Sequence, residues 1–152
     1  MEVICVAGDA DFERLHDLLV SYEATLPETL RHGRVPGLTE LRRGYGAPNA
    51  AFLAMTENGA AGCVAAIPVD ARTVQLLRLF VREECRGLGA AKALVAAVLA
   101  FARQGGYRRV VLDTDRDRLP AAYALYRSFG FTECAPFATS HSSSATFMDV
   151  SV

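Results

Sequence analysis

Two glycines near the middle of the chain stand where a backbone could bind a phosphate. Gly87 and Gly89 follow an apolar run that ends at Val81, and a helical pattern begins directly after them. Glycine lets the backbone turn tightly and leaves N–H groups open to a ligand, since it has no Cβ. The first turn of a helix adds N–H groups without intrahelical partners and a partial positive charge. The spacing therefore predicts a phosphate-binding loop, with Arg86 and Lys92 adding positive charge beside it.

Other interpretations of these glycines remain open. They could simply close a turn between a strand and a helix, or belong to a dinucleotide-binding fingerprint. The fingerprint is disfavoured because Lys92 occupies its third glycine position and because the chain after Asp113 is too short for the rest of a doubly wound sheet. No G-x-x-x-x-G-K-[ST] loop is present.

The composition indicates an ordinary globular domain, which we expect to span residues 1–152. The chain has 16 basic and 17 acidic residues, so no net charge favours a nucleic-acid partner or a membrane surface. Its first residues lack the basic region of a signal peptide, and its longest apolar runs are about half as long as a membrane-spanning helix. The four cysteines lie far apart, as in a reducing compartment. We therefore expect a cytoplasmic protein.

The periodicity of apolar residues predicts a mixed α/β fold. Predicted helices run from Asp9 or Asp11 to Tyr22, over residues 39–44 with Thr39 as cap, from the glycines to Gly105, and from Pro120 to Gly130. Predicted strands cover residues 2–7, 50–56, 60–69, 74–81, 109–113, 131–135 and 145–150. The order β-α-(α)-β-β-β-α-β-α-β-β gives a seven-stranded, mostly antiparallel sheet with helices on both faces.

Three stretches, which follow one another along the chain in the order that the family has them, resemble the GCN5-related N-acetyltransferase (GNAT) family. Residues 86–91 (RGLGAA) resemble its Q/R-x-x-G-x-G/A pyrophosphate loop, and residues 79–81 (LFV) stand where its fourth strand parts from the fifth. Residues 122–131 resemble the helix and strand that carry the family's tyrosine acid. Residues 77–81 with 112–114 look most like a bacterial subgroup whose substrates are mostly unassigned.

The resemblance implies direct transfer of an acetyl group from acetyl-CoA to an amine in a ternary complex. Tyr126 would be the general acid that protonates the leaving thiolate, because a phenol stays protonated at neutral pH. A main-chain N–H of Phe80 or Val81 would stabilise the oxyanion. The residues implied in binding the cofactor are Leu79, Phe80, Val81, Arg86, Gly87, Leu88, Gly89, Ala90, Ala91 and Lys92.

Two positions depart from the family pattern. Leu119 replaces an asparagine that contacts the cofactor, and Gln75 replaces an acidic residue that deprotonates the amine. The general base is therefore unassigned: Glu83 or Glu84 could act through water, Asp113 is a third candidate, and a chain of water molecules would also suffice. These departures also motivate an alternative function, a catalytically silent acyl-CoA sensor with the same fold.

The acceptor is expected to be a small-molecule or peptide amine. The family builds its acceptor site from two irregular segments, here residues 24–45 and 137–144, which contain Arg31, His32 and His141. Arginines in the first segment would suit an acceptor with a carboxylate or a phosphate. No two histidines have metal-ligand spacing, so we predict no metal. Dimers are common in the family, which allows a homodimer.

Overall fold

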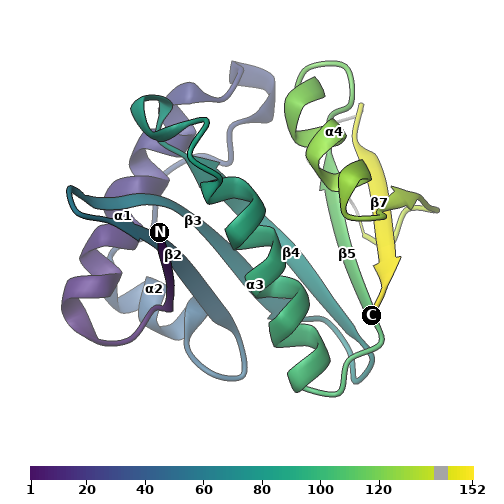
Figure 1. Ribbon diagram of the computed structural model, residues 1–152, viewed down its shortest axis with the longest axis horizontal. Helices are drawn as coiled ribbons and strands as arrows, with labels where there is room; N and C mark the ends of the chain where they lie inside the picture. The colour runs from purple at the N-terminus through teal and green to yellow at the C-terminus, as the bar shows by residue number, and fades with distance from the viewer. Residues whose placement is uncertain (139–143) are drawn as a thin grey trace.

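A seven-stranded sheet forms the centre of the computed structural model, which describes residues 1–138 and 144–152 (Figure 1). The strand order is β1-β2-β3-β4-β5-β7-β6, and every neighbouring pair is antiparallel except β4 and β5. The strands are β1 (Glu2–Cys5), β2 (Ala50–Thr56), β3 (Gly59–Pro68), β4 (Thr73–Val81), β5 (Arg109–Thr114), β6 (Thr132–Glu133) and β7 (Thr146–Ser151). The fold class and element order expected from the sequence are confirmed.

Helices cover both faces of the sheet and bury a separate apolar cluster on each. On one face, α1 (Gly8–Thr25) and α2 (Leu38–Tyr45) pack against side chains such as Leu53 and Cys63. On the other, α3 (Ala90–Gln104) and α4 (Pro120–Ser128) pack against side chains such as Val64 and Val110. Figure 1 shows α3 lying across the central strands, with α4 beside β5 and β7. Two short 3-10 helices complete the fold, η1 (Glu28–Leu30) and η2 (Glu83–Cys85).

The differences from expectation lie at the ends of elements. The N-cap of α2 is Gly37, without a side-chain hydrogen bond, so Thr39 is not the cap. In α1 the N-cap is Ala7, whose N–H donates to Asp11 at 3.0 Å. Strand β6 has only two residues because it pairs with just Met148 and Asp149 of β7. None of the helices in the described ranges is long and apolar enough to cross a membrane.

Candidate active site

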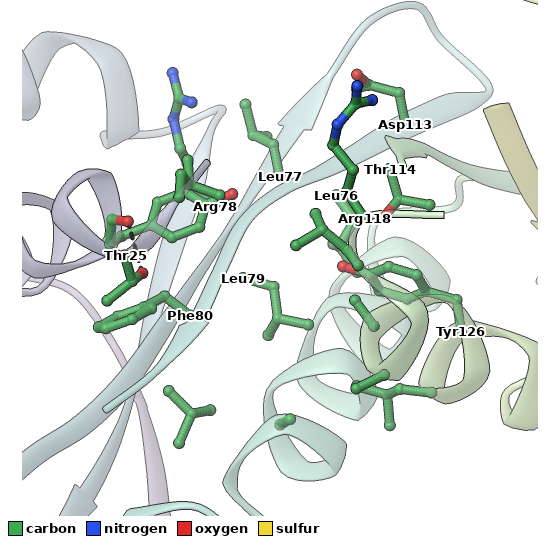
Figure 2. Close-up of a pocket in the computed structure, with 18 of the residues that line it drawn as sticks. Thr25, Leu76, Leu77, Arg78, Leu79, Phe80, Asp113, Thr114, Arg118 and Tyr126 are labelled. Atoms are coloured by element: carbon green, nitrogen blue, oxygen red, sulfur yellow. Dashed lines mark hydrogen bonds between the residues drawn. The ribbon is translucent and has the colours of Figure 1, made fainter. Parts of the chain in front are cut away.

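The sheet opens between β4 and β5. These parallel strands pair only at Thr73–Gln75 with Arg109–Val111. Beyond that point β5 stays paired with β7 and β4 stays paired with β3, so the two strands separate. A cavity of about 680 Å³ lies at this opening, between a wall from α1 and β4 and a wall from β5 and α4 (Figure 2). The parting of these strands was expected from the sequence and is present.

A β-bulge at Arg78 shapes the β4 wall. Leu77 pairs with Ala65 and Phe80 pairs with Cys63, so β4 has one residue more than β3 between these points. Arg78 takes φ 61°, and it is the only non-glycine residue with positive φ in residues 1–138 and 144–152. The thiol of Cys63 donates to the carbonyl oxygen of Arg78 at 3.5 Å. Such bulges often re-aim backbone and side chains next to active sites.

The bulge determines which N–H groups of β4 face the cavity. Arg82 donates to Ala61 on β3, and Phe80, two residues earlier, has the same orientation. Of the two donors expected from the sequence, Phe80 therefore directs its N–H toward β3. Val81 directs its N–H toward the cavity, and Leu79 does the same because successive residues of a strand alternate. Neither N–H on this side has a partner strand, because β5 has already diverged.

Tyr126 projects from α4 into the opposite wall of the same cavity (Figure 2). Its side chain is buried, with 6% of the residue exposed, and its ring packs edge-to-face on Phe131 at 5.9 Å between centroids. Burial raises the pKa of the phenol well above its usual range, and the nearby Tyr22 and Asp113 raise it further. The hydroxyl therefore remains a proton donor at neutral and alkaline pH.

The predicted phosphate loop has the geometry of an open backbone cradle. Gly87 and Gly89 adopt φ 82° and 84°, which strongly favour glycine, and a Cβ on either would project into open space. Gly89 is the N-cap of α3, and no side chain caps this helix and no acidic residue lies in its first turn. Arg86 and Ala91 line the cavity. These residues fit an anionic diphosphate at the helix start.

A second, smaller chamber adjoins the first on the side of α1 and α2. Its volume is about 220 Å³, and both chambers are lined by Tyr22, His32 and Arg78. The other residues that line it are Leu19, Glu23, Arg34, Val35, Pro36 and Tyr45. Its walls combine apolar and aromatic side chains with a few charged ones, which is typical of a site for a small organic molecule.

Glu23 and His32 form a tightly bonded pair at the boundary of the two chambers. Nδ1 of His32 lies 2.7 Å from Oε1 of Glu23, and the main-chain N–H of His32 donates to both carboxylate oxygens at 3.0 and 2.9 Å. The rings of Tyr22 and His32 lie 5.9 Å apart, and Tyr22 also contacts Phe80 at 5.6 Å. Burial raises the pKa of Tyr22 to about 12, although the Arg78 charge opposes this.

Arg118 lines the cavity and is held in place by a buried carboxylate. Asp115 is 1% exposed, and its Oδ2 accepts from Arg118 at 2.9 Å and from the Ser144 hydroxyl at 2.5 Å. Its Oδ1 accepts from the main-chain N–H groups of Asp117 and Arg118. The Ser144 hydroxyl, the Arg118 N–H and the Arg118 guanidinium hold the pKa of Asp115 at about 2, against the opposing effect of burial.

The other residues singled out from the sequence lie in different places. Glu83 and Glu84 are exposed on η2 and line neither chamber, whereas Gln75 and Asp113 line the main cavity. Arg31 also lines neither chamber, and its Nε donates to the Leu26 carbonyl at 3.2 Å.

Two residues expected to bind the cofactor are exposed, one expected acceptor residue is not described, and the sequence analysis did not identify several residues that line the cavity. Leu88 and Lys92 are exposed beside the glycine loop. His141 lies outside the described residues. Sequence reasoning missed Tyr22, Glu23 and Arg78 as cavity residues. A lone arginine within the apolar β4 was the one available signal for Arg78.

In the part of the chain that the structure describes, no group of three or more histidine, cysteine, aspartate or glutamate side chains could hold a metal ion. The four cysteines are free, and Cys63 alone among them is buried.

Comparison with known proteins identifies similar sequences. The sequence model described as the acetyltransferase (GNAT) family matches residues 13–131. Human N-acetyltransferase 8 is 48% identical over 85 residues, which cover 53% of this chain and 37% of the human protein. An uncharacterized N-acetyltransferase of Schizosaccharomyces pombe is 41% identical over 98 residues, covering 62% of this chain and 60% of that protein. The chain thus matches less than two thirds of the length of these relatives, 37% of the human protein and 60% of the yeast protein.

Solved structures with the same fold include bacterial acetyltransferases. A GNAT-family acetyltransferase of Staphylococcus aureus has a TM-score of 0.79 at 19% identity and covers 99% of both chains. A phosphinothricin acetyltransferase of Sinorhizobium meliloti, solved in complex with AcCoA, has a TM-score of 0.77 at 19% identity and covers 100% of this chain and 89% of that one. At such identities the likeness shows the fold alone. Since the similar proteins include human and yeast sequences, the expected bacterial subgroup is too narrow a description.

Proposed function

The chain belongs to the GNAT family of acetyltransferases, and we propose that it transfers an acetyl group from acetyl-CoA directly to an amine. One observation carries this proposal. Where β4 and β5 separate, two main-chain N–H groups of β4 face a buried, protonated tyrosine across a cavity that reaches both a glycine cradle and a second chamber. A binding protein would need the cradle but not the tyrosine or the second chamber.

The cofactor would lie along the opening, from the glycine cradle to the bulge. The amides from Gly87 to Ala91 would hold its diphosphate, with Arg86 adding positive charge. The outward backbone groups of Leu79 and Val81 would hydrogen-bond its pantetheine arm in the manner of a strand. Acetyl-CoA supplies an acetyl thioester, whose carbonyl carbon accepts the amine and whose sulfur departs.

The residues around the opening would each have a separate task. The N–H of Leu79 or Val81 can donate to the carbonyl oxygen of the thioester and stabilise the negative charge that develops there. Tyr126 can donate its proton to the departing sulfur, since its raised pKa keeps the phenol protonated. The aromatic and apolar side chains of the second chamber would hold the acceptor and exclude water.

The test is release of CoA from acetyl-CoA in the presence of a panel of primary amines that includes phenethylamine, phenylalanine and short peptides. We expect amine-dependent CoA release and an acetylated product by mass spectrometry. The sensor alternative makes the opposite prediction. If the protein binds CoA in calorimetry but acetylates no amine of the panel, the proposal is wrong.

A further inference from the structure

We infer that Glu23 and His32 form the general-base pair that removes a proton from the acceptor amine. This inference rests on the proposed acetyl transfer and assigns the role that the sequence left open. An alkylammonium is only about 0.1% neutral at pH 7, so transfer at neutral pH requires a group that accepts its proton.

The geometry points to His32 because it stands at the boundary between the two chambers. It lines both the main cavity, which also contains Tyr126, and the smaller chamber beside α1. Because His32 lines both chambers, an amine that spans them would lie beside this ring. About a quarter of the His32 side-chain surface, 28%, is exposed.

Glu23 fixes the chemistry of the ring. An ionised carboxylate can only accept hydrogen bonds, so Nδ1 of neutral His32 must carry the hydrogen that bonds Oε1 at 2.7 Å. The lone pair is then on Nε2, the atom that can take a proton. The same carboxylate also holds the main-chain N–H of His32, which limits the freedom of the loop that carries the ring. Glu23 is thus a positioning residue, and it also stabilises the imidazolium that forms.

Among the described residues, the charged and titratable groups that line the smaller chamber together with His32 come from several elements. Glu23 and Tyr22 come from α1, Tyr45 comes from α2, Arg34 lies on the same loop, and Arg78 comes from β4. The charges of these two arginines act on the ammonium and on the imidazolium alike, so the Glu23 carboxylate bonded to Nδ1 is the group that favours the proton on His32.

The other candidate bases are less well placed. Gln75 cannot accept a proton, and Glu83 and Glu84 line neither chamber. Asp113 is the strongest rival, since it lines the main cavity from β5, on the same wall as Tyr126 (Figure 2). It does not border the smaller chamber, however, so it does not line the space proposed for the body of the acceptor.

The proposed proton transfers balance as follows. The acceptor enters as RNH3+, and one proton passes to Nε2 of His32. The neutral nitrogen then forms the C–N bond to the acetyl carbon at the expense of the C–S bond, while Tyr126 donates its proton to the sulfur. The second amine proton returns to the Tyr126 oxygen, and His32 releases its proton to solvent. One proton is therefore released for each amide formed.

The test exploits amines of nearly equal size and different basicity. Phenethylamine and its β,β-difluoro analogue differ little in shape, but fluorine makes the second amine largely neutral at pH 7, so it needs no base before attack. We compare kcat/KM for both amines in the wild type, His32→Gln, Glu23→Gln and Asp113→Asn. His16→Gln is the matched control, because His16 is a half-buried residue of α1 that lines neither chamber.

We expect His32→Gln to lower kcat/KM for phenethylamine by about 100-fold and that for the difluoro analogue by less than about threefold. Glu23→Gln should show the same selectivity with a smaller loss, about 10-fold. As a readout independent of turnover, 15N NMR of the three histidines should show His32 as the Nδ1–H tautomer in the wild type and a mixed tautomer in Glu23→Gln.

Several outcomes would overturn the inference. Equal losses for both amines would mean that His32 has only a structural role, and a selective loss in Asp113→Asn instead would assign the base to Asp113. Either result leaves acetyl transfer itself intact. Absence of transfer to any amine by the wild type would overturn the proposed function and the base together.

Discussion

The carbonyl oxygen of Phe80 points so closely at Gly62 on the neighbouring strand that a Cβ at position 62 would lie 2.4 Å from it. The atom that this Cβ would meet belongs to the backbone, so the overlap could be relieved only by moving β3 or β4, not by rotating a side chain. Gly62→Ala should therefore destabilise the fold by about 1–3 kcal/mol. It should also weaken CoA binding, because a displaced Phe80 carbonyl turns the N–H of Val81 away from the opening.

Denaturant unfolding and calorimetry with CoA would measure both effects. Gly44→Ala is the control, because Gly44 lies within α2 and a Cβ there meets nothing within 4 Å. This control should be neutral or stabilise by up to about 1 kcal/mol, since alanine is the better helix former. Unchanged CoA affinity in a folded Gly62→Ala protein would contradict the prediction.

The glycine cradle can be tested by a pair of matched substitutions. Gly89 and Gly106 lie near opposite ends of α3 with φ 84° and 78°, and a Cβ on either meets no neighbour. Alanine at either position should cost about 1–2 kcal/mol of stability through backbone strain. Only Gly89→Ala should reduce affinity for CoA, because its methyl group enters the space of the diphosphate. Equal CoA affinity in the two variants would remove the cradle from the binding site.

Tyr126→Phe removes the proposed acid without removing the packing of its ring. We expect kcat to fall about 100-fold, with little change in the affinity for CoA. Burial raises the pKa of this phenol, so the wild type should show no loss of kcat from its ionisation as the pH rises from 7 to 10. Tyr123→Phe serves as control, because Tyr123 donates to Glu133 at 2.9 Å and does not line the cavity. A Tyr126→Phe enzyme with full activity would reject the assignment.

Arg78 should select for acceptors that carry an anion. It lines both chambers, and it forms no ion pair among the described residues. Arg78→Asn should preserve the bulge, because asparagine tolerates positive φ better than most residues. The KM for phenylalanine should rise about 10-fold, while the KM for phenethylamine, which lacks only the carboxylate, should stay constant. Arg43→Gln, at an exposed position outside both chambers, should change neither.

The Asp115 carboxylate should make the stability of the fold depend on pH. Its folded-state pKa of about 2 is below the ordinary value of 3.8, so its contribution is present above pH 4 and is lost as the pH falls toward 2. Asp115→Asn should cost about 2 kcal/mol at pH 7, and its difference from the wild type should shrink between pH 4 and pH 2. Asp117→Asn, whose side chain is 84% exposed, should show no such dependence. Denaturant unfolding at several pH values would measure both.

The fold was predictable because its signals are local. Gly87 and Gly89, the Asn58-Gly59 turn and Pro120 each mark a boundary by their own backbone preferences, and apolar periodicity assigns the elements between them. In the turn between β2 and β3, Gly59 takes a positive φ and Asn58 does not. Tyr126 was found through a motif that places it near the cofactor, not through its own environment.

The walls of the site were less predictable, because they depend on how distant segments meet. Glu23 hydrogen-bonds His32, nine residues later, and the segment between them is irregular, so the periodicity of apolar residues does not predict this contact. Asp115 is buried because Ser144 and Arg118 converge on it, which its sequence neighbours do not indicate. The bulge at Arg78 shifts the pairing of β4 with β3 by one residue, and the alternation of apolar residues in the sequence does not reveal this shift.

That single extra residue has a consequence for how this strand can evolve. Removing one residue between Leu77 and Phe80 would leave equal numbers of residues on β3 and β4 between these points, so the bulge would be lost while Phe80 kept its pairing with Cys63. Without the bulge, no residue would take the positive φ of Arg78, and the backbone beside the cavity would lose the shape that the extra residue gives it. We expect β4 to accept many substitutions but no deletion or insertion, so its length is more constrained than its composition.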